Sequence, residues 1–234
     1  MIEKKDHNNM GSADYGILQS LFHFSFADYY NPNNINFGVL RVINDDIVHP
    51  KQGFDLHPHK DMEIITYVIE GELTHKDSMN HKRTLTKGHV QYMSAGTGVY
   101  HSEHNLGENP LRFLQIWILP DKKNHTPQYG DYLFDWEARK NKWLHLVSGK
   151  QGSAPITIHQ DVNLYAVELE KNNSLEFPID KGRQAYAVLI DGLSSINGIE
   201  LETRDGLEII EESISIAAKE TSHILLIEMN ASNI

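Results

Sequence analysis

Short runs of β-branched and aromatic residues dominate the hydrophobic pattern of this chain, and long amphipathic helical periods are scarce. Ile64–Ile69 is one continuous apolar run, and Leu111–Leu119 is another that ends at Pro120. Gly, Asn and Asp residues separate such runs at short intervals, which is typical of β-sandwiches and β-barrels. The pattern therefore predicts an all-β protein.

Glycine turns mark a weak internal repeat. Gly71 ends the first run and leads into Glu72–His75, which indicates a hairpin. The same layout recurs where Tyr186–Ile190 is followed by Gly192 and Leu193–Ile196, and this repetition predicts a duplicated barrel. The remaining pattern predicts a short helix or turn and then a strand in Trp136–Leu146, and later strands at Ile156–His159, Asn163–Glu170, Glu208–Ile210, Ser213–Ile216 and His223–Glu228.

The composition narrows the functional classes. A length of 234 residues allows one large or two small domains. The net charge of −11 disfavours nucleic acid as a partner, because phosphates require a basic surface. No apolar run approaches the roughly 20 residues of a membrane span, so no membrane partner is expected. The chain has no cysteine, so any metal must bind through His and carboxylate, and a cytoplasmic location is expected.

Two short segments carry the candidate chemistry, His57-Pro58-His59 and His101-Ser102-Glu103. Residues i and i+2 of a strand project from one face, so each segment directs two potential ligands into one cavity. Two such strands on facing walls of a barrel would bring three imidazoles and one carboxylate together. This donor set suits Fe, Mn, Ni, Cu or Zn and leaves coordination positions open. Because Pro58 removes one ladder hydrogen bond, we expect an edge or bulged strand there.

Several neighbouring residues leave alternatives open. Glu63 lies four residues beyond His59 and is a second carboxylate that could reach a metal. His104 follows Glu103 and is expected to point to the opposite face of its strand. Phe24, Phe26 and Phe54 could line a pocket for an aromatic substrate, but buried core is the default interpretation. Single histidines elsewhere, including His75, are interpreted as structural.

Five blocks of sequence point to one family: Phe24–Tyr30, Leu40–Asp46, Gly53–Glu63, Tyr67–Gly71 and Met93–Glu103. Together they make nearly the whole chain similar to the pirin family of the cupin superfamily, and most similar to bacterial members with quercetin 2,3-dioxygenase activity. The resemblance implies a bicupin of two antiparallel jelly-roll β-barrels. It implies a metal-binding barrel in residues 1–120, a connection in 121–145, and a barrel without metal ligands in 146–234.

The resemblance also implies a site and a reaction. The metal ligands of the family fall on His57, His59, His101 and Glu103, with Glu63 left as an alternative ligand or a supporting acid. One divalent transition metal is expected, iron first, with Mn, Ni, Cu, Co or Zn as alternatives. The implied activity is cleavage of the heterocyclic ring of flavonols such as quercetin by O2, with Glu103 as the catalytic base. No further cofactor is expected.

A second function stays open, because pirins also include regulatory proteins whose metal senses redox state and changes binding to protein partners. The expected partners of the enzyme are a flavonol-like aromatic substrate and O2. A monomer is expected, since a bicupin satisfies internally what single-barrel cupins gain by dimerising.

Overall fold

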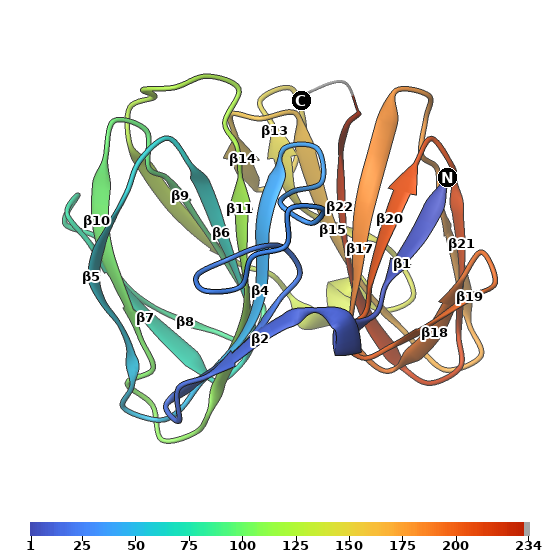
Figure 1. The fold of residues 1–234 in the computed structure, drawn as a ribbon, viewed down its shortest axis with the longest axis horizontal. Coiled ribbons are helices and arrows are strands. Elements are labelled where there is room, and N and C mark those ends of the chain that lie inside the picture. Colours follow the sequence, from blue (N-terminus) through green and yellow to red (C-terminus); the bar gives the residue numbers. More distant parts are fainter. Residues whose placement is uncertain (232–234) are drawn as a thin grey trace.

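Two β-barrels of the jelly-roll type lie side by side in a computed structural model of this chain, which is an all-β bicupin as predicted (Figure 1). The structure describes residues 1–231, so the last three residues of the expected C-terminal barrel, 232–234, lie outside it. The helices in the described part are two short 3-10 turns, η1 (His7–Asn9) and η2 (Trp136–Arg139). Between residues 1 and 231, no helix is long and apolar enough to cross a membrane.

The N-terminal barrel consists of a seven-stranded sheet in the order β12-β9-β6-β11-β4-β3-β2 and a four-stranded sheet in the order β5-β10-β7-β8. All of its strand pairs are antiparallel. Its strands are β2 (Gly11–Asp14), β3 (Leu18–Phe22), β4 (Leu40–Val48), β5 (Gly53–His59), β6 (Glu63–Glu70), β7 (Glu72–Asp77), β8 (Lys82–Thr86), β9 (His89–Ser94), β10 (Val99–His104), β11 (Leu111–Ile118) and β12 (Gln128–Leu133).

The C-terminal barrel repeats this plan, with sheets in the orders β1-β20-β17-β22-β15-β13-β14 and β16-β21-β18-β19. One pair, β13 and β14, is parallel. Its strands are β1 (Ile2–Lys5), β13 (Leu144–Gly149), β14 (Ile156–Ile158), β15 (Val162–Leu169), β16 (Ser174–Phe177), β17 (Arg183–Asp191), β18 (Leu193–Ile196), β19 (Ile199–Glu202), β20 (Gly206–Ile210), β21 (Ile214–Ala218) and β22 (Ser222–Asn230).

The hairpin predicted at Gly71 is wrong. The chain does turn there, but β6 belongs to the seven-stranded sheet and β7 to the four-stranded sheet, so Gly71 is a corner between sheets. Gly71 has a φ of 78°, and a Cβ on it would lie 2.5 Å from the carbonyl oxygen of Pro110. Gly192 makes the same corner between β17 and β18 with a φ of 102°. The repeat read from the sequence therefore corresponds to equivalent corners of two barrels.

Two strands pair outside the regions expected from the sequence, which were a barrel in residues 1–120, a connection in 121–145 and a second barrel in 146–234. The first strand, β1, pairs with β20 in the sheet of the C-terminal barrel, so the N-terminal segment crosses to the other half (Figure 1). Strand β12 lies within the expected connection but pairs with β9 of the N-terminal barrel. Both strands are positioned by pairing with strands that are distant in the sequence. A local hydrophobic pattern does not show which distant strands will pair.

The largest apolar core lies between the barrels, where the two seven-stranded sheets face each other. Alternate residues of β6 and β11 contribute from one side, and alternate residues of β17 and β22 from the other. Their side chains include Ile65, Tyr67, Ile69, Leu114, Ile116, Ile118, Tyr186, Val188, Ile190, Leu225, Ile227 and Met229. These sheets are therefore buried on both faces, which explains why their strands have nearly continuous apolar sequences.

The interiors of the two barrels differ. The C-terminal barrel is filled by aliphatic side chains such as Val167, Leu189 and Ile216. The N-terminal barrel has two smaller apolar clusters, one around Phe113 and one around Met93. Polar side chains occupy the space between these clusters, and they form the candidate site described below.

Asp205 fastens the N-terminal segment to the C-terminal barrel. Its buried carboxylate lies 2.7 Å from Lys4 Nζ and accepts hydrogen bonds from the backbone N–H groups of His7, at 2.9 Å, and Glu202, at 2.8 Å. Burial alone would raise the pKa of Asp205, but the hydrogen bonds from Lys4, His7 and Glu202 outweigh it and the pKa is lowered. The folded state therefore stabilises the ionised form of Asp205 relative to its protonated form.

We predict that Asp205→Asn lowers the free energy of unfolding by about 1–3 kcal/mol at pH 7, because it weakens bonds to buried donors. A lowered pKa stabilises the fold above the unfolded value of about 3.9 and loses that contribution as pH falls through the folded value. Urea titrations should therefore show a gap between wild type and variant that narrows below pH 4. Glu200→Gln, which removes an exposed ion pair with Lys219, is the control and should change little. A gap independent of pH would contradict this assignment.

Candidate metal centre

The two histidine segments lie on neighbouring strands of one sheet. His57 and His59 come from β5, the edge strand of the four-stranded sheet, and His57 pairs directly with His101 of β10. The expectation of facing walls was wrong, because direct pairing of antiparallel strands already brings such side chains within about 5 Å of each other. The edge position expected from Pro58 is confirmed.

Three imidazoles converge at this point. The ring centroids of His57 and His101 are 4.5 Å apart, and each lies 4.8 Å from the ring of His59. One nitrogen from each ring can be chosen so that all three lie within 4.8 Å of one another. His57 Nδ1 lies 2.7 Å from the carbonyl oxygen of Asp55, to which it can donate, and this would leave Nε2 for a metal.

The rings of His59 and His101 are neutral near pH 7. Burial, together with the neighbouring rings of His101 and His57, lowers the pKa of His59 to about 3. Burial likewise lowers the pKa of His101 to about 3, together with His57 and His75. His101 is buried, and neither ring nitrogen has a hydrogen-bond partner among the described residues. A buried imidazole without a partner is costly unless its lone pair binds a ligand that the protein atoms do not supply.

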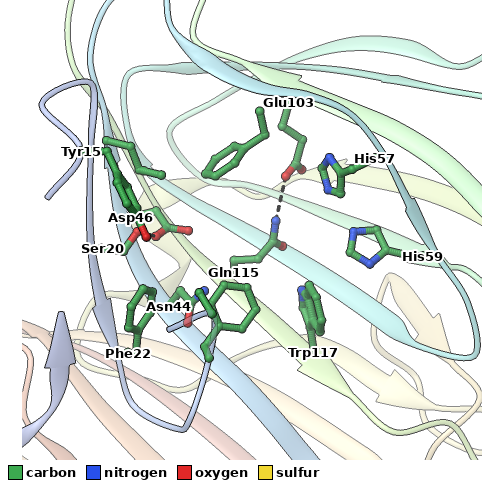
Figure 2. Close-up of a pocket in the computed structure, with 14 residues that line it drawn as sticks. Tyr15, Ser20, Phe22, Asn44, Asp46, His57, His59, Glu103, Gln115 and Trp117 are labelled. Carbon is green, nitrogen blue, oxygen red and sulfur yellow. Dashed lines mark hydrogen bonds between the residues drawn. The ribbon is translucent and has the colours of Figure 1, made fainter. Parts of the chain in front are cut away.

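Glu103 crosses the barrel interior to the opposite sheet. Its Oε2 accepts a hydrogen bond from Gln115 Nε2 at 2.7 Å (Figure 2). Its Oε1 accepts one from Gln91 Nε2 at 2.9 Å and a longer one from Thr66 Oγ1 at 3.3 Å. Each carboxylate oxygen offers two lone-pair directions, so these amide donors orient Glu103 without exhausting its capacity to bind a metal.

Sequence reasoning missed the residues that hold Glu103. Gln115, Thr66 and Gln91 are cross-strand neighbours on β11, β6 and β9, and they form one polar row across the inner face of the seven-stranded sheet. Thr66 Oγ1 also donates to Gln115 Oε1 at 2.9 Å. The signal was present, because Thr66 and Gln115 are polar residues within otherwise apolar runs. Interpreting it required knowing that the two strands are neighbours.

His75 is a second residue that sequence reasoning left as structural. It is buried on β7, pairs with Glu103, and can join His101 and Glu103 in a second, overlapping group of potential ligands. Its Nε2 lies 3.1 Å from Asp77 Oδ2, and its ring stacks on Tyr129 with centroids 4.7 Å apart. These partners give His75 a structural role beside the metal centre.

Glu63 turns away from the site. As the residue before Ile64, which packs inside the barrel, it points toward the other half of the molecule. Its carboxylate accepts the backbone N–H groups of His159, at 2.9 Å, and Gln160, at 3.1 Å, and a hydrogen bond from Tyr92 Oη at 3.2 Å. Glu63 is therefore a buried acid satisfied across the interface between the barrels, and it is not among the groups that could hold a metal within residues 1–231.

His104 also points away, as its place in the strand predicted. Its Nε2 lies 3.3 Å from Asp55 Oδ1, and both groups are on the outer face of the sheet. His104 is next to Glu103 in the sequence, but it lies on the outer face of the sheet and Glu103 lies on the inner face. His104 is therefore a matched control for the proposed ligands.

A cavity of about 160 Å³ opens beside the imidazoles. His57, His59 and Glu103 line one end, and Trp117 lies against His59 with ring centroids 4.9 Å apart (Figure 2). The aromatic side chains of Tyr15, Phe22, Phe26 and Phe54 line much of the remainder. Of the three phenylalanines considered from the sequence, Phe26 and Phe54 contribute to this cavity, whereas Phe24 packs in the core between the barrels.

The donor set fits a transition metal. His57, His59 and His101 form one group of potential ligands, and Glu103 belongs to an overlapping group with His75 and His101. These nitrogen and oxygen donors are of the kind that Fe, Ni, Mn, Cu and Zn accept. The buried nitrogens of His101 without protein partners are the observation that calls for such a group. The adjacent cavity gives a small molecule access to the same point.

Comparison with known proteins identifies a family and several relatives of this chain. Residues 4–118 match the model of the family described as Pirin, and residues 145–229 match that of the quercetinase C-terminal cupin domain. A quercetin 2,3-dioxygenase of Escherichia coli is 42% identical over 231 residues, covering 98% of this chain and 99% of that protein. A pirin-like protein of Caulobacter vibrioides is 40% identical, covering 97% and 99%. The crystal structure of the bacterial pirin YhhW of Escherichia coli in complex with nickel(II) superposes with a TM-score of 0.91, at 40% identity and 98% and 99% coverage.

We predict that His101→Ala abolishes stoichiometric metal binding, whereas His104→Ala leaves it near the wild-type level. The two histidines lie on one strand, but His101 belongs to the cluster and His104 lies on the outer face. Elemental analysis of both variants after reconstitution with Fe, Ni and Zn would check this. Equal metal content in the two variants would contradict the assignment of His101.

We also predict that Gln115→Leu lowers metal affinity about 10- to 100-fold, because Glu103 loses its shortest hydrogen bond and its orientation. Competition with a chelator of known affinity measures the change. Gln128→Leu, at an exposed position of β12, is the control and should bind metal as wild type does. Unchanged affinity in Gln115→Leu would show that metal binding by Glu103 does not need the hydrogen bond from Gln115.

Proposed function

The chain belongs to the pirin family, and on that premise we propose that it is a metal-dependent dioxygenase that cleaves the heterocyclic ring of flavonols such as quercetin. The observation that carries this proposal is the convergence of His57, His59 and His101, of which His57 and His59 line one end of an aromatic-lined cavity. Reconstitution with several metals and O2 uptake with quercetin test which metal and which substrate the site uses.

Each part of the site has a function in this proposal. A transition metal held by the three imidazoles and Glu103 would supply Lewis acidity and electron transfer with O2. The cavity walls receive the planar rings of a flavonol, and Trp117 and Phe54 border the space next to the ligands. The same apolar walls keep bulk water from the reacting atoms.

Glu103 is the proposed base. A flavonol must lose the proton of its 3-hydroxyl group to react with O2, and the carboxylate of Glu103 is at the end of the cavity where that hydroxyl group would bind. Gln91 and Gln115 hold the carboxylate from the opposite sheet, so its position does not depend on the substrate. Both atoms of O2 enter the ring-opened ester, and the carbon that carried the hydroxyl group leaves as carbon monoxide.

The regulatory alternative uses the same metal but not the cavity. A redox sensor that binds protein partners needs no apolar pocket beside its metal, and the aromatic lining therefore favours the enzyme. Metal-dependent binding to a partner without uptake of O2 would favour the sensor. The monomeric state remains a prediction that sedimentation would test.

We predict that the metal-loaded protein consumes O2 in a quercetin-dependent reaction and releases carbon monoxide. Glu103→Gln should lower kcat about 10²- to 10⁴-fold, the usual contribution of a general base, because the amide cannot accept the proton. An oxygen electrode and elemental analysis on the same sample separate loss of the base from loss of metal. His104→Ala is the control with expected wild-type turnover.

Two outcomes would overturn parts of this proposal. Unchanged turnover in metal-replete Glu103→Gln would remove Glu103 as the base. Stoichiometric metal without O2 uptake in wild type, across reconstitution with Fe, Mn, Ni, Cu and Co, would reject the dioxygenase and favour the sensor.

A further inference from the structure

The cavity beside the metal centre has a second polar end. Ser20, Asn44 and Asp46 line it, and they lie on β3 and β4, away from His57 and His59 (Figure 2). Ser20 pairs with Asp46 across the two strands, and Asn44 precedes Asp46 by two residues on the same inner face. The metal ligands do not use any of these three residues.

Asp46 is a buried carboxyl group that forms no ion pair with any other residue in the range 1–231. Its Oδ1 accepts a hydrogen bond from Ser20 Oγ at 2.5 Å. The preceding residue, Asp45, faces the other barrel and binds both Arg112, at 2.8 Å, and Arg204, at 3.0 Å. Burial, together with the charges of Asp45 and Glu103, raises the pKa of Asp46 to about 7, although the hydrogen bond from Ser20 opposes the shift. Burying such a group is costly, so stability of the fold does not explain its presence.

Asn44 supplies an independent observation. Its side chain is only 3% exposed, and Oδ1 has no hydrogen-bond partner among residues 1–231. A buried amide left unpaired costs free energy comparable to a lost hydrogen bond, so native structures rarely contain one. Asn44 and Asp46 thus both line this part of the cavity with oxygen atoms that can accept further hydrogen bonds.

We propose that Ser20, Asn44 and Asp46 form a subsite that binds a phenolic hydroxyl group on the part of the substrate remote from the metal. This inference rests on the proposed function and narrows its substrate class to polyhydroxylated flavonols. A phenolic hydroxyl group has one hydrogen to donate, and Asn44 Oδ1 and the carboxylate of Asp46 can share it as acceptors in a three-centre hydrogen bond. The aromatic side chains between the two ends then contact the flat rings that connect the two polar groups.

The test compares quercetin with 3-hydroxyflavone, which keeps the 3-hydroxyl and carbonyl groups but lacks the other hydroxyl groups. Asp46→Asn and Asn44→Leu should raise KM for quercetin about tenfold, the effect of losing one hydrogen bond. Neither variant should change KM for 3-hydroxyflavone, and kcat should stay within about twofold for both substrates. Asp180→Asn, at an exposed position of the other barrel, is the matched control.

A binding measurement separates this inference from the proposed function. Dissociation constants of both flavonols for the Zn-loaded protein, measured by fluorescence quenching, do not require turnover. Weaker binding of quercetin alone in Asp46→Asn and Asn44→Leu supports the subsite even if wild type consumes no O2. Equal changes for the two flavonols, or no change, would overturn the subsite whether or not wild type turns over quercetin. Thermal melting of both variants checks that they fold.

Discussion

A buried carboxylate must be hydrogen-bonded, and this requirement organises the interior of the N-terminal barrel. Glu103 extends from the four-stranded sheet and is held by Gln91, Gln115 and Thr66 of the seven-stranded sheet. The polar row that meets it replaces apolar packing at the centre of the barrel. This contact fixes the fourth potential ligand from the side opposite its own strand.

The main apolar core and the candidate site lie in different parts of the molecule. The largest apolar core lies between the two seven-stranded sheets, outside the interior of either barrel. The C-terminal barrel adds an aliphatic interior of its own. The N-terminal barrel is therefore supported from one face by the other half of the molecule, and its own interior can carry polar side chains that would weaken an isolated barrel. Asp45 and Glu63 extend this support with buried polar contacts across the interface.

Much of the fold and part of the candidate site could be predicted from the sequence. The apolar runs, the glycine turns and the repeat indicated two β-barrels, and the i, i+2 spacing of His57 and His59 indicated potential ligands on one face. The pairing of β1 with the far barrel, the corner at Gly71 and the supporting residues Gln91 and Gln115 could not be predicted. Each depends on which strands are neighbours, and strand order is a long-range property that local patterning does not encode.

Glu63 and Glu103 show the difference between what the sequence determines and what only the tertiary structure decides. The sequence by itself determined that two acids accompany three histidines, that no cysteine competes with them, and that the ligands alternate along strands. Only the tertiary structure decided which acid faces the imidazoles. Glu63 is on the face of β6 that meets the second barrel, and Glu103 is on the inner face of β10. Side-chain alternation assigns residues to two faces, but which face becomes the interior depends on the packing of both sheets.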